Sequence, residues 1–415
     1  MIYNNSIYNE NWATKKLDEL GTFKRGKSKH RPRNDKALFI DGTYPLIQTG
    51  EIREANLYVR KHTDTYNEFG LKQSKIWAKD TLCITIAANI AETALLGYPM
   101  CFPDSVVGFN AFPEVSSEIF MHYVFTFIKT AIKNAASGSI QDNINVDYLT
   151  SLNLKIPSKE YQDKIATVLS TLDEKIELNQ RINSELEAMA KTLYDYWFVQ
   201  FDFPDQNGNP YKSSGGEMVW NKELKREVPI GWAVGVLSDI ANITMGQSPP
   251  GESYNNEKEG SIFFQGCTDF NTRFPSVRLY TTSPTRFAKV GDILLSVRAP
   301  VGTLNIANNN CCIGRGLAAL NGKICTNAFL YEVLKNLKQI FDRRNTDGTT
   351  FGSITKDDLF SLHVVVPSNN ILLKYQKIGN VAFEKQNTIE EETQQLIALR
   401  DWLLPMLMNG QVAVV

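Results

Sequence analysis

The residues best suited to binding chemistry lie in one short basic segment near the N-terminus. Between positions 24 and 36 the chain holds seven Lys or Arg residues and a single acid, Asp35. Gly26, Ser28 and Pro32 interrupt this segment, so it lacks the alternating charges of a surface helix. Lysine and arginine on a loop suit DNA phosphates, and arginine can also fork onto guanine, whereas a solvated charged surface is the alternative. The DNA contacts predicted in this segment are Lys24, Arg25, Lys27, Lys29, Arg31 and Arg33.

Two small polar loops could carry further DNA contacts. Residues 137–143 and 346–353 each contain a glycine that suits a tight turn, Gly138 or Gly348, and a pair of arginines precedes the second loop. A plain connection between strands is an equally good interpretation of these glycines. The additional DNA contacts predicted in and just before these loops are Ser139, Gln141, Arg343, Arg344 and Thr349. Arg298, one of the more dispersed arginines of the second copy, is predicted as a DNA contact as well.

Catalytic motifs are missing from the sequence. It has no GxxxxGK[ST] phosphate loop and no glycine-rich nucleotide fingerprint, so neither ATP nor S-adenosylmethionine is expected to bind this chain. Ser248-Pro249-Pro250-Gly251 lacks the residues that amino-methyltransferases place around Pro-Pro, and is interpreted as a rigid surface loop. The six cysteines and four histidines are scattered and form no zinc-site pattern. No catalytic residue, metal ligand or cofactor of its own is predicted for this chain.

One loose pattern fits a magnesium-dependent nuclease. Asp205, followed by Glu223-x-Lys225, matches the order of acidic and basic residues in such enzymes. They hold the metal between two carboxylates on adjacent strands, with the lysine near the attacking water. Here both parts fall in a Pro- and Gly-rich segment without a predicted strand. A chance match is therefore favoured, and nuclease activity is the lesser alternative.

The candidate residues must be positioned by larger elements, and the clearest is a helix from Ser158 to about Phe203. No glycine or proline interrupts this stretch, and Ser158 is a good N-cap. Its apolar residues alternate in steps of four and three, which is the seam of a helix packed along another helix over roughly 60 Å. Asn179 and Asn183 lie on this seam, where polar groups fix the register. The packing residues predicted are Ile165, Leu169, Leu172, Ile176, Leu186 and Leu193.

The expected partner is a second helix, from Ser368 to about position 410. It repeats the four-three alternation, with Lys385 and Glu392 on a more polar seam. Since neither helix would be stable alone in water, the two are expected to pack on each other as one rod. The packing residues predicted are Ile378, Ile389, Leu396, Leu399 and Leu403.

The chain also contains an internal repeat. Trp12, Leu17 and Gly26 match Trp232, Leu237 and Gly246 at an offset of 220 residues. Gly138, Ile144 and Pro157 match Gly348, Ile354 and Pro367 at an offset of 210 residues. Each copy therefore consists of a globular unit followed by a long helix.

The predicted fold class is α+β, with two similar globular domains separated by the two helices in a pseudo-twofold repeat. Runs such as TLCITIA and DILLSVRA predict strands, and residues 117–135 and 327–344 predict helices. The expected divisions are a first domain over 1–157, a helix over 158–203, a linker over 204–228, a second domain over 229–367 and a helix over 368–410.

The overall composition indicates a globular protein of a reducing compartment. Apolar residues make up 43% of the chain and charged residues 21%, and no run is long and apolar enough to span a membrane. The N-terminus lacks the pattern of a signal peptide, and the cysteines are expected to be free thiols. A cytoplasmic location is expected. The net charge of −1 excludes a uniformly basic nucleic-acid binder, so the basic segment stands out locally.

The repeat and its helices resemble the specificity subunit (HsdS) of type I restriction–modification systems over nearly the whole chain. The resemblance rests on the Trp12 and Trp232 entries, on the Gly138 and Gly348 loops, and on the helix IATVLSTLDEKIELNQRINSELEAMAKTLYDYWF. The segments FDFPDQNGNPYKSSGGEMVW and LRDWLLPMLMNGQ are similar to that family as well.

The resemblance implies a non-catalytic DNA-binding subunit with two target-recognition domains, each reading half of a bipartite, asymmetric site. It implies that the two long helices are antiparallel and form a coiled-coil spacer, which also serves as the docking surface for modification subunits. It implies two modification subunits that bind S-adenosylmethionine and methylate adenine. It also implies restriction subunits that use ATP and Mg for translocation and cleavage. Base-contacting residues differ with the site read, so none is carried over. Two further hypotheses are a specificity subunit of a motor-less methyltransferase–nuclease system and a coiled-coil scaffold without DNA function.

Overall fold

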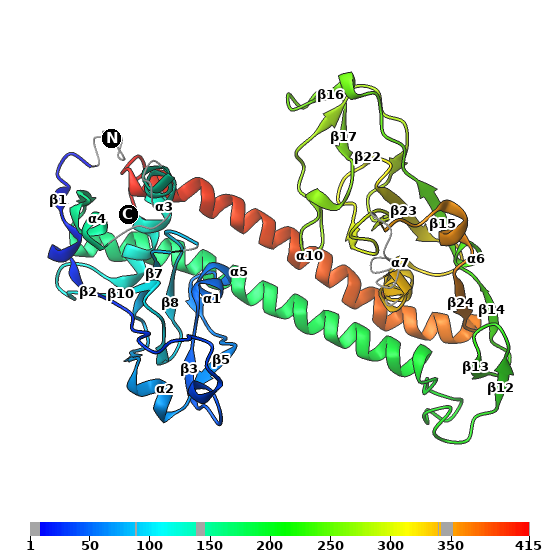
Figure 1. The fold of residues 1–415 in the computed structure, drawn as a ribbon. Coiled ribbons are helices and arrows are strands. Elements are labelled where there is room, and N and C mark those ends of the chain that lie inside the picture. Colours follow the sequence, from blue (N-terminus) through cyan, green and yellow to red (C-terminus); the bar gives the residue numbers. More distant parts are fainter. Residues whose placement is uncertain (1–8, 88, 138–145, 339, 342–351, 415) are drawn as a thin grey trace. The chain divides into compact units, whose positions relative to one another are not determined.

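The computed structural model describes residues 9–87, 89–137, 146–338, 340–341 and 352–414. The chain divides into two units, Met1–Asn179 with Thr393–Val415 and Gln180–Glu392 (Figure 1). Among the described residues, no helix is both long and apolar enough to span a membrane.

The first unit is built on two sheets and a short strand pair. Its larger sheet has the order β2-β10-β7-β8-β4, its smaller sheet the order β5-β3-β9-β6, and β1 pairs with β11. The strands of the larger sheet are β2 (Gly21–Arg25), β10 (Val106–Ala111), β7 (Leu82–Thr85), β8 (Thr93–Leu96) and β4 (Tyr58–Val59). The others are β5 (Asp64–Tyr66), β3 (Tyr44–Leu46), β9 (Met100–Cys101), β6 (Ile76–Trp77), β1 (Ala13–Lys15) and β11 (Leu154–Ile156).

The second unit repeats this arrangement. It has a sheet of order β15-β23-β20-β21, a sheet of order β16-β18-β17-β22-β19 and the pair β14-β24. The first sheet consists of β15 (Ala241–Met245), β23 (Leu317–Gly322), β20 (Ile293–Ser296) and β21 (Leu304–Ile306). The remaining strands are β16 (Tyr254–Asn255), β18 (Tyr280–Thr281), β17 (Ser261–Phe264), β22 (Cys311–Ile313), β19 (Phe287–Ala288), β14 (Ala233–Val236) and β24 (His363–Val366).

Strand register confirms the internal repeat residue by residue. Ala13 faces Ile156 across β1–β11, and Ala233 faces Val366 across β14–β24. In the sheets that contain β3 and β17, one parallel pair joins Leu46 to Cys101 and its counterpart joins Phe263 to Cys312. The two units therefore share these strand pairings, as the offsets in the sequence predict, although their sheets differ in the number of strands.

Helices complete each core. In the first unit, α3 (Glu118–Ser137) packs on β7 and β8, and in the second, α7 (Asn327–Asn336) packs on β23. Strands such as β7 and β20 are buried at every position, because a sheet covered on both faces has no polar face. The shorter helices are α1 (Thr49–Glu54), α2 (Glu68–Lys72), α4 (Val146–Ser151), α6 (Leu237–Ile240) and α9 (Lys356–Phe360).

The two long helices are α5 (Lys159–Tyr194) and α10 (Asn369–Met408), and both contribute to both units. In the first unit, Arg400 Nη1 donates to Asp173 Oδ1 at 2.7 Å, and Tyr161 lies beside Val412. In the second unit, Gln386 Nε2 donates to the Asn183 carbonyl at 3.4 Å, so the helices are antiparallel there as well. The predicted helix pairing is thus confirmed within each unit.

The seam of α10 differs from the prediction at every second position. Ile378 and Leu399 were expected to be buried on the seam, but they are 52% and 42% exposed. The buried positions are one residue further on, at Gly379, Gln386 and Thr393. The prediction missed these positions because Gly379, Gln386 and Thr393 are small or polar, and an apolar pattern does not mark such residues as buried. Of the other predicted packing residues, Ile165, Leu169, Ile176 and Ile389 are buried, and Leu172, Leu186, Leu193, Leu396 and Leu403 are partly buried.

Two boundaries also differ from the sequence expectation. The regular α-helix ends at Tyr194 and continues as a π-helical turn over Asp195–Val199, short of Phe203. The segment expected to lack strands contains the hairpin β12 (Met218–Asn221) and β13 (Arg226–Pro229). The hairpin forms because Val228 is buried in the core of the second unit, an anchor that turn composition does not reveal.

Candidate nucleic-acid interface

The basic segment begins on a strand and continues as a structured loop in the first unit. Lys24 and Arg25 end β2, and Gly26 then passes close to the turn before β10, where its N–H donates to the Val106 carbonyl at 2.8 Å. A Cβ at Gly26 would lie 2.3 Å from the Pro103 carbonyl oxygen, so only glycine fits there. Side-chain contacts hold the rest of the loop in place.

Three arginines of this segment gather around one acid on the neighbouring turn. Arg33 Nη2 donates to Asp104 Oδ1 at 2.7 Å, and Arg31 Nη2 lies 3.8 Å from Asp104 Oδ2. Arg25 donates through Nε to the Asp104 carbonyl. One aspartate thus orients three guanidinium groups, and the cluster keeps a net positive charge on an exposed surface.

The lysines of the segment are available to a ligand. Lys24, Lys27 and Lys29 are exposed, and within the described residues their side chains have no ion-pair partner. Gln73, just after α2, fixes the loop by accepting from the Lys29 N–H at 2.7 Å and from the His30 N–H.

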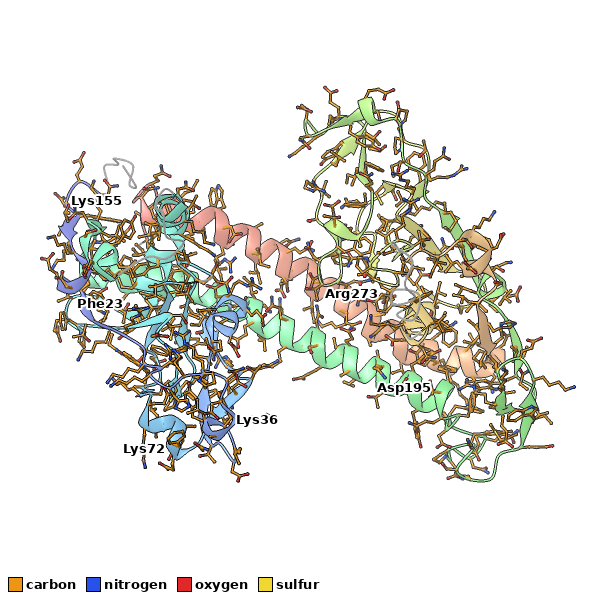
Figure 2. The ribbon with its side chains drawn as sticks, viewed as in Figure 1. Phe23, Lys36, Lys72, Lys155, Asp195 and Arg273 are labelled. Carbon is orange, nitrogen blue, oxygen red and sulfur yellow. The ribbon has the colours of Figure 1, made fainter. Side chains whose placement is uncertain are left out.

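Two lysines beside Gln73 lie near the basic segment and were not predicted from the sequence. Lys72 and Lys75 flank Gln73 and are not buried, and Figure 2 shows Lys36 and Lys72 at the same end of the unit. Sequence separation hid this relation, because only the fold brings α2 beside residues 29–36.

The second unit repeats the backbone of this site with different charges. Gly246 N–H donates to the Leu317 carbonyl at 2.9 Å, as Gly26 does to Val106, and a Cβ at Gly246 would meet the Gly314 carbonyl. By this correspondence Arg315 occupies the place of Asp104. The loop after Gly246 contributes no arginine, so the turn itself supplies the positive charge.

The predicted residues in the second unit fall partly outside the described region. Arg298 is exposed and follows β20, where it forms a β-bridge with Ser353. It lines a pocket together with Arg278 and Arg315. The predicted contacts Ser139, Gln141, Arg343, Arg344 and Thr349 lie outside the described residues.

Each domain is fastened to the long helices by buried polar contacts. In the first unit, the Tyr123 hydroxyl donates to Asp173 Oδ2 at 2.6 Å, while Arg400 donates to the other oxygen of that carboxylate. Burial raises the pKa of Tyr123 and lowers the pKa of the adjacent His122 to about 4. In the second unit, Arg273 is 6% exposed, donates to Asn387 and the Phe383 carbonyl on α10, and lies over the Phe383 ring (Figure 2).

The first acid of the nuclease-like pattern, Asp205, binds the backbone of its own segment. Asp205 Oδ1 accepts from the Asn207 and Asn209 N–H groups, each at 2.8 Å, as in an Asx turn. Glu223 and Lys225 lie in the turn of the β12–β13 hairpin. Within the described part of the chain, no group of three or more His, Cys, Asp or Glu side chains could hold a metal ion.

Comparison with known proteins gives two matching regions. The model of the type I restriction modification DNA specificity domain family matches residues 9–188 and 229–399. The chain is 26% identical to the type I restriction enzyme MjaIX specificity subunit of Methanocaldococcus jannaschii, over 98% of this chain and 94% of that protein. It is 26% identical to the type I restriction enzyme HindI specificity subunit of Haemophilus influenzae, over 68% of this chain and 73% of that protein. A crystal structure of the type I restriction-modification S subunit from M. genitalium shares the fold, with a TM-score of 0.63, 18% identity and coverage of 98% of this chain and 99% of that one.

Proposed function

The chain belongs to the type I restriction–modification DNA specificity family, and we propose that its two domains each read one half of a bipartite, asymmetric DNA site. As the DNA specificity subunit it is the non-catalytic member of its system. The recognition domains proposed are residues 1–157 and 229–367, with 204–228 linking the first copy to the second.

The observation that supports this proposal most directly is the matched pair of basic sites on the two domains. The turn before β10 in one unit and the turn before β23 in the other make the same backbone contacts, to Gly26 and to Gly246 respectively. Their charged side chains differ, since arginines surround Asp104 in one and Arg315 replaces that acid in the other. Equivalent frames carrying different side chains would bind DNA in the same way and read different bases.

We further propose that the long helices bind the modification subunits. On α10, Val381 is 65% exposed in the second unit and Trp402 is 56% exposed in the first. Large apolar side chains exposed on a helix favour a protein partner, and α10 carries such a position in each unit. Two modification subunits would supply S-adenosylmethionine and methylate adenine, while restriction subunits would supply ATP- and Mg-dependent cleavage. The free cysteines agree with assembly in the cytoplasm.

The test is to express the chain with its modification subunits in a host that lacks adenine methylation and to sequence the modified genome. We expect methylated adenines in a single motif of two unlike half-sites separated by a fixed gap. Replacing residues 1–157 by those of another family member should change one half-site and keep the other. A continuous motif, or a swap that alters both halves, would contradict the proposal.

A separate measurement distinguishes the nuclease alternative. The purified chain should bind DNA without cutting it when magnesium is present. Cleavage that disappears in an Asp205→Asn variant would instead support nuclease activity.

A further inference from the structure

An arginine-lined pocket of about 260 Å³ lies on the second unit, at the ends of strands β17 and β20. Four separate segments form it: the residues after β17, the residues before β18, the residues after β20 and the turn between β22 and β23. Its polar lining residues include Gln265, Asp269, Arg278, Ser296, Arg298 and Arg315. Because the strands fix all four segments, the pocket is part of the folded domain.

A buried aspartate fixes the orientation of one arginine side chain in this pocket. Arg278 Nε donates to Asp269 Oδ1 at 2.8 Å, and the exposed fractions of the two side chains are 66% and 6% respectively. Among the residues that the structure describes, the two terminal nitrogens of the guanidinium have no ion-pair partner, so they are available to a ligand. Since Asp269 already restricts the side chain, binding a flat ligand would cost less conformational entropy than for a free arginine.

The other two arginines add charge without a counter-ion. Within the described residues, the side chains of Arg298 and Arg315 have no ion-pair partner, and both are exposed. The backbone beneath Arg298 is fixed, because the Ser296 hydroxyl donates to the Arg298 carbonyl at 2.7 Å. The pocket therefore presents several guanidinium groups from a rigid base.

The composition of the pocket favours the edge of a base over a phosphate. A site for phosphate alone is weakened by a carboxylate, which repels the anion, yet Asp269 lines this pocket. Gln265 brings both a donor and an acceptor, and phosphate does not use the acceptor. Guanine offers two acceptors, O6 and N7, in the spacing that the arginine fork matches, and its paired cytosine offers a donor.

The first unit has a different chemistry at the equivalent positions. The parallel pairs Leu46–Cys101 and Phe263–Cys312 align Gln48 with Gln265, and the turn alignment places Asp104 where Arg315 lies. By the same alignment Ala87 takes the place of Arg298. The pocket with its three arginines thus belongs to the second domain and would contribute to one half-site only.

We propose that this pocket reads a G·C pair in the half-site of the second domain, with Arg278 forking onto guanine and Asp269 acting as its positioning residue. The inference rests on the proposed function and adds to it the residues and the base. Arg298 and Arg315 strengthen the same contact through their charge.

The test measures binding of the full-length chain to a library in which every base of both half-sites varies. In Arg278→Ala, the preference for guanine at one position of the second half-site should fall about 10- to 100-fold, with the first half-site unchanged. Arg278→Lys should lose the same preference while keeping the charge, because an ammonium lacks the fork. Asp269→Asn should weaken it by a smaller factor. Lys323→Ala removes an exposed charge at the other end of β23 and should leave every base preference intact.

Each contrary outcome has a distinct meaning. A uniform loss of affinity with a smaller salt slope and unchanged base preferences in Arg278→Ala would identify a phosphate contact and overturn the inference. Unchanged preferences in all Arg278 variants would do the same while leaving the proposed function intact. If the parent chain showed no sequence preference at all, the proposed function would fail and the inference with it. Thermal unfolding of each variant verifies that the domain is folded.

Discussion

At the scale of single residues, the two domains carry positive charge at equivalent turns, but through different residues. Asp104 collects arginines from the loop after β2, whereas Arg315, at the equivalent turn, supplies the charge itself. A carboxylate that pairs with arginines neutralises part of their positive charge but fixes the orientation of their guanidinium groups. Hydrogen bonding to base edges requires such a fixed orientation. Lys24, Lys27 and Lys29 have no such orienting acid within the described residues, so they suit phosphates.

The first prediction separates these two groups. Replacing Lys24, Lys27 and Lys29 by Ala should lower affinity for all DNA sequences, because each lysine that contacts a phosphate releases a counterion on binding. The slope of log affinity against log salt should fall by about 0.9 for each lost contact. Fluorescence anisotropy across a salt series measures this slope, and Lys222→Ala on the exposed β12–β13 turn is the control. An unaltered slope would show that the lysines only solvate the surface.

A second residue-scale prediction concerns His122, which burial keeps neutral with a pKa of about 4. In the unfolded chain its pKa returns to about 6.5, so the unfolded state binds the extra proton first as the pH falls. Stability should therefore decrease between about pH 6.5 and pH 4, by up to about 1.4 kcal/mol per pH unit. Urea unfolding at several pH values should show a weaker dependence in His122→Gln than in the parent chain. Identical slopes for both proteins would refute this account.

At the scale of elements, the long helices pair through polar and small residues more than their sequence pattern suggests. Asn179, Gln386 and Thr393 are buried, and Arg400 is neutralised by Asp173. Such contacts weaken packing relative to leucine, but they specify one register, because a shift would strand polar groups without partners.

The corrected seam gives a matched pair of substitutions on one helix. Ile389 is 5% exposed and Ile378 is 52% exposed. Ile389→Ala should destabilise the chain by about 2–4 kcal/mol through cavity formation, whereas Ile378→Ala should change stability by less than about 0.5 kcal/mol. Chemical denaturation of both variants measures the difference. Equal losses would mean that the register with Ile378 on the seam is correct.

Another prediction at this scale concerns the exposed apolar residues of α10. Val381→Asp in the second unit and Trp402→Asp in the first should each remove one modification subunit, because a charge replaces an apolar contact. Native mass spectrometry should show two bound subunits for the parent, one for each single variant and none for the double variant. Binding of the free chain to DNA should be unaltered. Full assembly of the double variant would place the docking surface elsewhere.

At the scale of the whole molecule, α5 and α10 both run from one unit into the other. We infer that the length of the pair sets the gap between the two half-sites, as a rigid spacer would. Its antiparallel stretches in each unit make the lengths of the two helices interdependent, so that a change in one requires a change in the other.

The last prediction tests this spacer. One heptad inserted after Asn179 and another after Glu392, at the boundaries of the units, should keep the seam in register. The pair should lengthen by about 10 Å, which corresponds to roughly three base pairs and a rotation of about 100° around the duplex. Selection of methylated sites from a library of gap lengths should give a longer preferred gap, unchanged half-sites and weaker binding, because DNA must twist to follow. Retention of the parental gap would show that the helices do not set the distance.

Features that depend on local pattern could be predicted from the amino-acid sequence. The repeat offsets, the strands TLCITIA and DILLSVRA and both long helices follow from spacing and hydrophobic period, and the structure has them at those places. The absence of catalytic motifs could also be read directly, since such motifs need particular residues at short spacing. The packing seam of α5 could be predicted because its buried positions are mostly apolar.

Contacts between distant residues depend on the tertiary fold and could not be predicted in this way. Asp104 joins Arg31 and Arg33, and Asp269 joins Arg278, through sheet pairings that leave no periodic trace in the chain. The α10 seam was misplaced because its buried Gln386 and Thr393 are polar, and burial of polar groups depends on partners supplied by another helix. The hydrophobic pattern of a sequence predicts which residues are buried, whereas recognition sites consist of polar residues that remain exposed to water. Their arrangement is therefore fixed by the fold that carries them.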